Sequence, residues 1–260
     1  MGSTAPDASV DRSTSKPPLS DIRAFLFDLD GVLTPTAEVH IRAWSRMFTP
    51  FLAARGSDYT ERDYFDYVDG KPRFDGVRSL LASRGIVLPE GTPEDGPEVE
   101  TVFGLGNRKN ADFSAELAEN GTAAYAGSAA FVAAAIRAGV AVAVVSSSAN
   151  AKPVLAAAGI LDLFPVVVDA NIARSLSLAG KPAPDTYVYA AEQLGLTPAE
   201  CAVFEDATSG VQAGADGAFG LVIGVDRGAG ADVLRQYGAD DVVEDLADLI
   251  PRLPQPDRTP

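Results

Sequence analysis

The sequence is poor in the residues from which many metal and catalytic sites are built. Its 260 residues include one cysteine, Cys201, and one histidine, His40. A single cysteine excludes an internal disulfide and any multi-cysteine metal site, and a single histidine excludes a zinc site built on several histidines. Positive charge is also scarce, since 21 Lys and Arg residues are outnumbered by 36 Asp and Glu, for a net charge of −15. Because such a chain repels phosphate backbones and anionic lipid, we expect no nucleic-acid and no membrane partner.

Long apolar runs are missing as well. No segment approaches the ~20 apolar residues of a membrane-spanning helix, and the first twenty residues lack the apolar stretch of a secretory signal. We therefore expect a reduced, cytoplasmic location. The chain does have 47% hydrophobic residues, which is ample for a folded core. An enzyme of this composition has to depend mainly on carboxylates, hydroxyls, lysine and a hard cation.

Short apolar runs separated by helical patterns indicate the architecture. Between the runs, apolar residues recur at helical spacing and stop at glycines such as Gly139, Gly159 and Gly195. Unalternating runs that end in Asp, Ser or Glu are typical of parallel strands covered on both faces. We therefore predict an α/β fold, a doubly wound parallel sheet. The predicted strands lie at 22–27, 140–145, 166–168, 202–204, 221–225 and 241–243.

The first part of the chain is organised differently. Residues 1–20 are rich in Ser, Thr, Pro and Asp, and we predict a disordered tail there. From 37 to 121, apolar residues such as Trp44 and Phe48 follow helical spacing and strand signals are weak. We interpret 37–121 as a helical insert placed after the first strand, in a core formed by 21–36 and 122–260. The segment PEGTPEDGPE at 89–98 is predicted to be an exposed loop.

Two pairs of acidic residues follow predicted strands. Asp28 and Asp30 lie in the segment DLDGVLT, and Glu205 and Asp206 end the run AVF. Ligands bind at the carboxyl ends of strands in open α/β sheets, and one carboxylate can attack phosphorus while its neighbour handles the proton. Adjacent acids such as 205 and 206 indicate a cation, and oxygen ligands suit Mg²⁺. The alternative is that each pair is only a solvated acidic turn.

A serine and a lysine follow two further segments of the predicted core. Ser146 begins the run SSS after the strand AVAVV, where hydroxyls and backbone N–H groups can cradle a phosphate or simply cap the next helix. Lys181 lies in GKPAPD, between glycine and proline. An ammonium group held there neutralises phosphoryl and carboxylate charge, whereas a solvated lysine has no such role.

In this order, the four segments resemble the motifs of the haloacid dehalogenase-like superfamily of aspartyl-phosphate enzymes, over about residues 22–245. The resemblance implies a Rossmann-like core with the insert as a helical cap over the active site. It also implies Asp28 as nucleophile and Asp30 as general acid and base, with Ser146 and Lys181 steadying the transferring phosphoryl group. Mg²⁺ would be held by Asp28, the Asp30 carbonyl, Asp206 and, directly or through water, Glu205.

The insert resembles the cap of β-phosphoglucomutases. The segment TAEVHIRAW at 36–44 matches a region in which a histidine, here His40, couples cap closure to the proton role of the second aspartate. A purely structural histidine is the alternative. DGKPR at 69–73 resembles the loop whose arginine grips the non-reacting phosphate, and RKN at 108–110 resembles a site for sugar hydroxyls. The substrate-binding residues implied are Thr36, Trp44, Gly70, Arg73, Lys109, Asn110, Ser147, Ser148 and Asn150.

Two residues depart from this pattern. Pro35 stands where these mutases usually carry Asp in the hinge, and Ala149 stands where they often carry lysine. Proline fixes φ and removes a hydrogen-bond donor, and alanine removes one phosphate contact. We expect a monomeric, Mg²⁺-dependent β-phosphoglucomutase that acts on a sugar phosphate. A sugar-phosphate phosphatase and, with less support, a regulatory protein on an inactive core are the alternatives.

Overall fold

The computed structural model describes residues 16–254. A six-stranded sheet forms its centre, in the order β3-β2-β1-β4-β5-β6, and every neighbouring pair is parallel. This confirms the predicted doubly wound α/β sheet. The strands are β1 (Ala24–Phe27), β2 (Ala141–Val145), β3 (Val166–Val168), β4 (Cys201–Glu205), β5 (Leu221–Val225) and β6 (Asp241–Val243).

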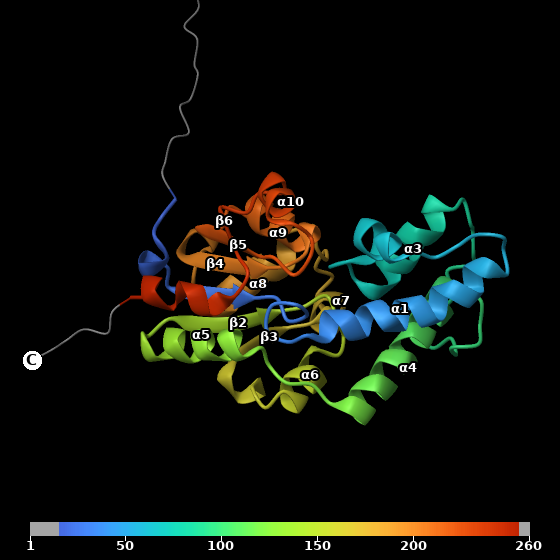
Figure 1. Ribbon diagram of the computed structural model, residues 1–260, viewed down its shortest axis with the longest axis horizontal. Coiled ribbons are helices and arrows are strands. Elements are labelled where there is room, and N and C mark those ends of the chain that lie inside the picture. The colour runs from blue at the N-terminus through green and yellow to red at the C-terminus, as the bar shows by residue number, and fades with distance from the viewer. Residues whose placement is uncertain (1–15, 255–260) are drawn as a thin grey trace, which may run out of the picture.

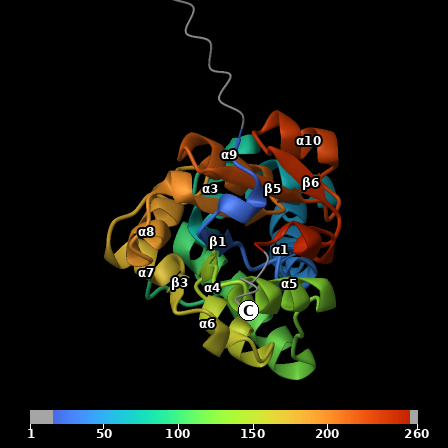
Figure 2. The ribbon, with the colours of Figure 1, turned by 90° about the vertical axis from the view of Figure 1, so that its left-hand side faces the viewer.

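Helices cover both faces of this sheet, as the end-on view in Figure 2 shows. They are α5 (Ala126–Arg137), α6 (Ala151–Ala157), α7 (Ala170–Ser175), α8 (Asp185–Gln193), α9 (Thr208–Asp216) and α10 (Ala231–Gln236). Phe131 and Val154 bury the α5 and α6 side, while Tyr187 and Val211 bury the α8 and α9 side. Short 3-10 turns lie at Leu19–Asp21, Leu161–Leu163, Pro198–Glu200 and Leu246–Arg252.

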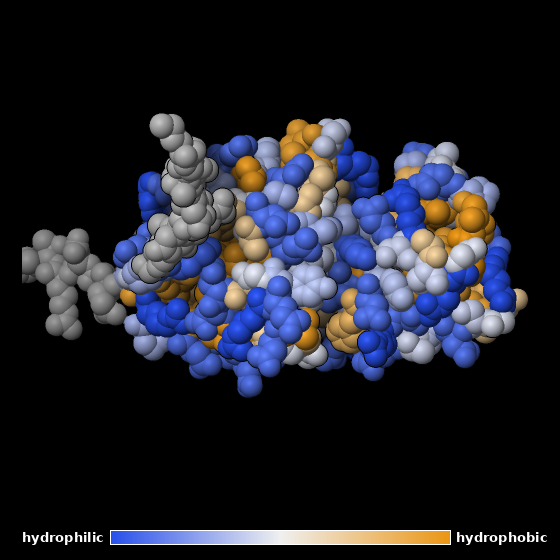
Figure 3. Space-filling model, turned by 90° about the horizontal axis from the view of Figure 1, so that it is seen from above, coloured by the Kyte–Doolittle hydropathy of each residue, from blue (hydrophilic) through white to orange (hydrophobic). Residues whose placement is uncertain are grey.

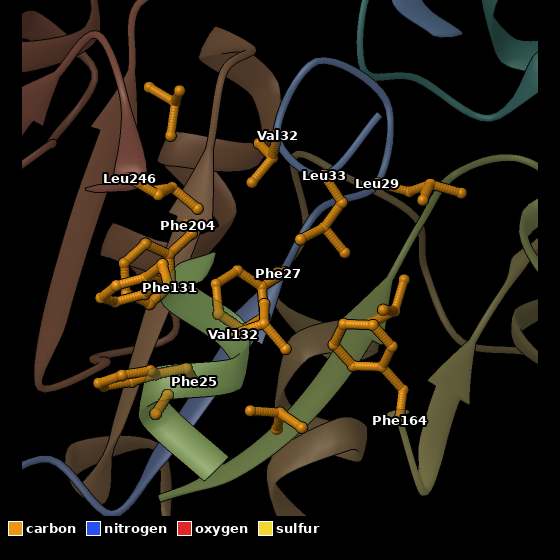
Figure 4. Close-up of a cluster of buried hydrophobic side chains, with 14 of the residues drawn as sticks. Phe25, Phe27, Leu29, Val32, Leu33, Phe131, Val132, Phe164, Phe204 and Leu246 are labelled. Carbon is orange, nitrogen blue, oxygen red and sulfur yellow. The ribbon is translucent and has the colours of Figure 1, made fainter. Parts of the chain in front are cut away.

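Phenylalanines dominate the first of these two cores. Phe27 and Phe204, on neighbouring strands, stack with ring centroids 4.8 Å apart, and Phe25 stacks on Phe131 of α5 at 5.4 Å (Figure 4). All four are fully buried. Burial of large rings and the alternation of side chains along β1 fix the register of the central strands. This core holds the strand ends, and the acidic side chains on them, in place.

The inserted segment forms a separate helical lobe at one end of the molecule (Figure 1). It contains α1 (Thr36–Ala53), α2 (Glu61–Asp63), a π-helical turn (Tyr64–Val68), α3 (Arg73–Ser83) and α4 (Val102–Asn120). The lobe has its own hydrophobic core, in which Phe48 of α1, Leu80 of α3 and Leu105 of α4 are fully buried. At the base of the lobe, Ala43 of α1 and Phe113 of α4 belong instead to the hydrophobic core that the sheet buries with α5 and α6.

The two chain connections between sheet and lobe lie side by side. The first runs from β1 to α1, and the second runs from α4 to α5 through residues 121–125. The Tyr125 N–H donates to the Leu33 carbonyl oxygen at 2.9 Å. The Arg227 guanidinium stacks on the Tyr125 ring at 4.1 Å and its Nε donates to the Gly31 carbonyl. The two connections are therefore tied to each other beside the loop that follows β1.

The structure corrects the sequence interpretation at the N-terminal edge. Residues 16–20 were included in the predicted tail, but Leu19 is only 1% exposed and packs in the core beside Ile22 and Leu253. Because the residues around Leu19 are mostly polar, composition alone does not predict that this one side chain is buried. The rest of the predicted tail, residues 1–15, lies outside the described residues. The first strand begins at Ala24 and not at 22.

The face of the molecule seen in Figure 3 is largely hydrophilic with scattered hydrophobic patches, in keeping with the net charge of −15. No helix within residues 16–254 is both long and apolar enough to span a membrane.

Candidate active site

The loop after β1 brings its two aspartates to the carboxyl end of the sheet. The Asp28 N–H donates to the Phe204 carbonyl at 2.9 Å, which continues the pairing of β1 with β4. The chain then turns at Gly31, whose φ of +88° is rarely adopted by other residues. A Cβ there would lie 1.8 Å from a carboxylate oxygen of Asp206. Glycine is therefore needed both for the turn and for the close approach of the two acidic segments.

Lys181 joins three strand ends. Its Nζ donates to Asp28 Oδ1 at 2.5 Å, to Glu205 Oε1 at 2.6 Å and to the Val145 carbonyl at 3.0 Å. The residue is 3% exposed. Although burial alone lowers the pKa of a lysine, the Asp28 and Glu205 carboxylates outweigh it and raise the pKa of Lys181 above its ordinary value. Lys181 is therefore charged at neutral pH, in line with the sequence prediction of a held ammonium.

Three carboxylates converge on one point beside this lysine. Ligand oxygens of Asp28, Glu205 and Asp206 all lie within 4.8 Å of one another. Burial and then the neighbouring carboxylates raise the pKa values of Asp28 and Asp206 well above normal, although Lys181 counteracts this at Asp28. Among the described residues, no cationic side chain pairs with Asp206. A buried, oxygen-only donor set with excess negative charge fits a hard divalent cation.

Asp30 lies on the other side of Asp28 and faces the helical lobe. It accepts a short hydrogen bond from the Thr36 hydroxyl, and its Oδ1 lies 3.5 Å from His40 Nε2. Burial raises the pKa of Asp30, but His40 and Thr36 more than compensate, so that the pKa falls below its ordinary value. Asp28 and Asp30 thus have pKa values shifted in opposite directions, as separate roles in proton and phosphoryl transfer require.

His40 connects Asp30 to a buried lysine of the lobe. Lys109 Nζ lies 2.5 Å from His40 Nδ1 and 5.2 Å from the centre of the Trp44 ring. Burial lowers the pKa of Lys109 to about 7, and burial together with Lys109 lowers the pKa of His40. Asp30, His40 and Lys109 thus form a row of titratable side chains that runs from the loop after β1 into the lobe. From the sequence, His40 was expected either to couple cap closure to Asp30 or to be purely structural.

The lobe and the core meet directly over the strand ends. Ser147 Oγ donates to the Gly70 carbonyl at 2.7 Å, and Asn150 Nδ2 donates to Asn110 Oδ1 at 2.8 Å. Ser209 Oγ donates to the Asp69 carbonyl at 3.3 Å. Gly70 has a φ of +67°, and a Cβ there would lie 2.1 Å from Ser209 Oγ. These contacts hold the lobe closed over the acidic cluster.

Most of the site residues predicted from the sequence line one cavity between lobe and core. Three of them do not: Thr36 and Lys181 are buried behind Asp30 and Asp28, and Ser146 accepts a bond from the Ser148 N–H at 3.0 Å. The predicted residues that line the cavity are Asp28, Asp30, His40, Trp44, Gly70, Arg73, Lys109, Asn110, Ser147, Ser148, Asn150, Glu205 and Asp206.

Three residues of the site were not predicted from the sequence: Asp69, Tyr64 and Tyr187. Asp69 lines the cavity, and burial together with Glu205 raises its pKa to about 6 despite its hydrogen bond from Tyr64. Tyr187 is fully buried and donates to Glu205 Oε1 at 3.1 Å. The sequence does contain a signal for Asp69, because this acidic residue directly precedes Gly70, which was predicted to bind substrate. The two tyrosines lie at apolar helical positions, where the sequence gives no sign of a polar contact.

The chain matches the family model of the haloacid dehalogenase-like hydrolases over residues 22–217. It therefore belongs to that family, whose members include phosphotransferases and phosphatases, and it is an enzyme of that type.

Within the family, the chain is 50% identical over 240 residues to a β-phosphoglucomutase of Mycobacterium bovis, which covers 88% of this chain and 92% of that protein. It is 31% identical over 229 residues to the β-phosphoglucomutase of Bacillus subtilis, with the same two coverages. The crystal structure of a β-phosphoglucomutase from Clostridium difficile matches with a TM-score of 0.71 at 24% identity, over 88% of this chain and 93% of that one. The chain thus belongs to the β-phosphoglucomutase family.

Proposed function

We propose that the protein interconverts β-D-glucose 1-phosphate and glucose 6-phosphate. The observation that carries the proposal is a single cavity with Asp28, Asp30 and the acidic cluster on its core side and Arg73 and Lys109 on its lobe side. A mutase has to hold two phosphates, one at the nucleophile and one remote from it. The 50% identity to a β-phosphoglucomutase of Mycobacterium bovis supports the same sugar phosphate.

In this proposal Asp28 carries the phosphoryl group and Asp30 moves the proton. Phospho-Asp28 transfers its phosphoryl group to the C6 hydroxyl of β-glucose 1-phosphate, and Asp30 takes the proton of that hydroxyl. The β-glucose 1,6-bisphosphate then turns round. An Asp28 oxygen attacks the phosphorus of the C1 phosphate, and Asp30 returns the proton to the C1 oxygen, which leaves glucose 6-phosphate and phospho-Asp28. Lys181 and Ser146 steady the phosphoryl group.

We further propose Mg²⁺ as the cation of the acidic cluster, held by Asp28, the Asp30 carbonyl, Glu205 and Asp206. When bound, it neutralises charge on the phosphoryl oxygens and on the carboxylates whose pKa values are raised in its absence. The insert 37–121 acts as the cap in this proposal, with Thr36, Trp44, Gly70, Asn110, Ser147, Ser148 and Asn150 around the sugar. A monomeric state and a cytoplasmic location remain predictions.

The decisive experiment is incubation with magnesium and β-glucose 1-phosphate, with glucose 1,6-bisphosphate as primer. The mutase yields glucose 6-phosphate in excess over inorganic phosphate. Release of inorganic phosphate alone would assign a phosphatase of the same core, and no reaction would favour a regulatory protein.

Arg73→Ala sharpens this assay. It removes a charge-assisted contact worth about 1.5–3 kcal/mol to the remote phosphate, which corresponds to roughly ten- to more than hundredfold in mutase kcat/KM. Acetyl phosphate has no second phosphate, so its hydrolysis should fall much less. An equal fall in both rates would instead indicate a general folding role for Arg73.

A further inference from the structure

A second cavity of about 300 Å³ adjoins the active site between lobe and core. Its lobe wall includes Arg73 and Phe74 at the start of α3, and its core wall includes Arg174 of α7 and Leu178 just after it. In Figure 1, α7 lies at the end of the core that faces the lobe. Arg73, Ser147 and Ala149 line both cavities, so the second lies directly beside the site that contains Asp28.

Two arginines face this cavity without a carboxylate to balance them. Among the described residues, neither Arg73 nor Arg174 has an acidic side chain within ion-pairing distance. Asp75 also lines the cavity, but it is paired with Arg78, which binds Glu90 as well.

The polar atoms of Arg73 are poorly satisfied. Its Nη2 reaches only Asn107 Oδ1, at 3.5 Å, and its Nε is buried without a hydrogen-bond partner. Arg73 and Arg174 line the same cavity, and burial and then the charge of Arg174 lower the pKa of Arg73 to about 10. A buried donor with no acceptor and two like charges on one cavity fit an anion between them.

Helix α7 is fixed relative to the phosphate-binding loop at 146–150. Asp169 caps the helix by accepting from the Asn171 and Ile172 N–H groups at 2.9 Å. Asn171 Nδ2 donates to the Ala149 carbonyl at 3.1 Å. These bonds fix the helix that carries Arg174 against the loop that contains Ala149, whose methyl side chain supplies no charge, and both residues line the second cavity. The core therefore presents one cation to this part of the cavity, and it comes from α7 and not from the loop.

We propose that Arg174 binds the non-reacting phosphate together with Arg73, so that the remote phosphate lies in a two-arginine site shared by core and lobe. This inference rests on the proposed function for the identity of the ligand. A phosphate dianion offers enough acceptor oxygens for two guanidinium groups. Because Arg174 belongs to the core and Arg73 to the lobe, the phosphate bridges the two and favours the closed arrangement.

The first test measures binding of β-glucose 1,6-bisphosphate by calorimetry, in full-length protein that carries Asp28→Asn to prevent turnover. Adding Arg174→Ala should weaken binding about tenfold or more, and Arg174→Lys should restore part of the affinity. Arg137→Ala is the matched control, since Arg137 is an exposed arginine on α5 that lines neither cavity. Unchanged affinity in Arg174→Ala, with a loss in Arg73→Ala, overturns the inference.

The second test does not depend on the sugar. Phenylglyoxal modifies accessible arginines, and mass spectrometry gives the rate at each one. Inorganic phosphate should slow the modification of Arg174 several-fold more than that of Arg137. Equal slowing at both overturns the inference. Protection of Arg174 in a protein that fails to bind the bisphosphate would keep the two-arginine anion site and refute the proposed function instead.

Discussion

The core and the lobe balance the charges of their halves of the site in different ways. In the core, Lys181 is paired with two carboxylates at 2.5 and 2.6 Å. In the lobe, Lys109 and Arg73 are buried or half-buried, and within residues 16–254 neither is paired with a carboxylate. A buried charge without a counter-ion costs free energy. Lys181 and its two carboxylate partners in the core are thus in place before substrate arrives, whereas the cations of the lobe are balanced only when an anion enters.

The largest effect should come from the nucleophile of the core. Asp28→Asn keeps the shape of the side chain and leaves Lys181 its bond to Glu205. An amide cannot form an acyl phosphate, so turnover and phosphoryl incorporation should fall by about a thousandfold or more. Intact-mass measurement after incubation with acetyl phosphate reports the incorporation, and thermal melting verifies the fold. Near wild-type incorporation would sink the assignment of Asp28.

Asp206→Asn tests whether the acidic cluster of the core also lacks a counter-ion. Burial and its carboxylate neighbours raise the pKa of Asp206, so the ionised form destabilises the metal-free protein at pH 7. In excess chelator the variant should melt above wild type. This gain should shrink as pH falls below 4, where Asp206 becomes protonated in the unfolded chain as well as in the folded one.

Magnesium should reverse that order. The variant replaces a charged carboxylate ligand with a neutral amide oxygen, so its Mg²⁺ affinity should drop by more than about tenfold, and its activity should follow the metal titration. A variant that melts below wild type in chelator would mean that Asp206 is balanced within the protein. Unchanged Mg²⁺ affinity would remove Asp206 from the metal site.

The same contrast explains what the sequence could predict. Core positions such as Asp28, Lys181 and Glu205 follow short apolar strands, and the parallel sheet brings all strand ends to one edge. Their convergence therefore follows from the order of elements alone. Contacts of the lobe, such as Lys109 with His40, depend on how two helices pack whose residues are 69 positions apart. The family resemblance indicated both residues but not their contact.

Other features had no sequence signal. Arg174 lies in the short helix α7, and its place on the same cavity as Arg73 depends on the position of α7 against the lobe. Tyr187 belongs to an apolar helix face, so its bond to Glu205 looked like ordinary core packing. Leu19 is one apolar residue in a polar segment, and periodicity cannot identify an isolated anchor.

Lys109→Met tests the claim that the lobe carries an uncompensated cation. Burial lowers the pKa of Lys109 to about 7, so the unfolded chain binds the proton more tightly than the folded one. The resulting loss of stability is complete below pH 7 and disappears as pH rises toward 10.5. The variant should therefore be more stable than wild type at pH 7, by on the order of 1–3 kcal/mol, and less so at pH 9.5.

Urea unfolding at the two pH values measures this difference, and mutase activity should fall while stability rises. Lys152→Met, on the exposed face of α6, is the control and should show no such dependence on pH. Loss of stability at pH 7 in Lys109→Met would indicate that Asp30 and His40 already balance the lysine.

The smallest effect should come from a neutral contact between the two halves. Ser147 Oγ donates to the Gly70 carbonyl at 2.7 Å, and Ser147→Ala leaves that oxygen to water when the lobe opens and without a donor when it closes. The net cost to the closed form is about 0.5–1.5 kcal/mol, which corresponds to a rise of roughly two- to twelvefold in KM for β-glucose 1-phosphate.

Ser175→Ala is the matched control, because Ser175 donates within α7 at 2.9 Å and is exposed. Steady-state kinetics should therefore separate the two serines, while their melting temperatures stay together, because neither serine belongs to a hydrophobic core. A fall in melting temperature in Ser147→Ala alone would mean that the contact supports folding and not only the closed position of the lobe.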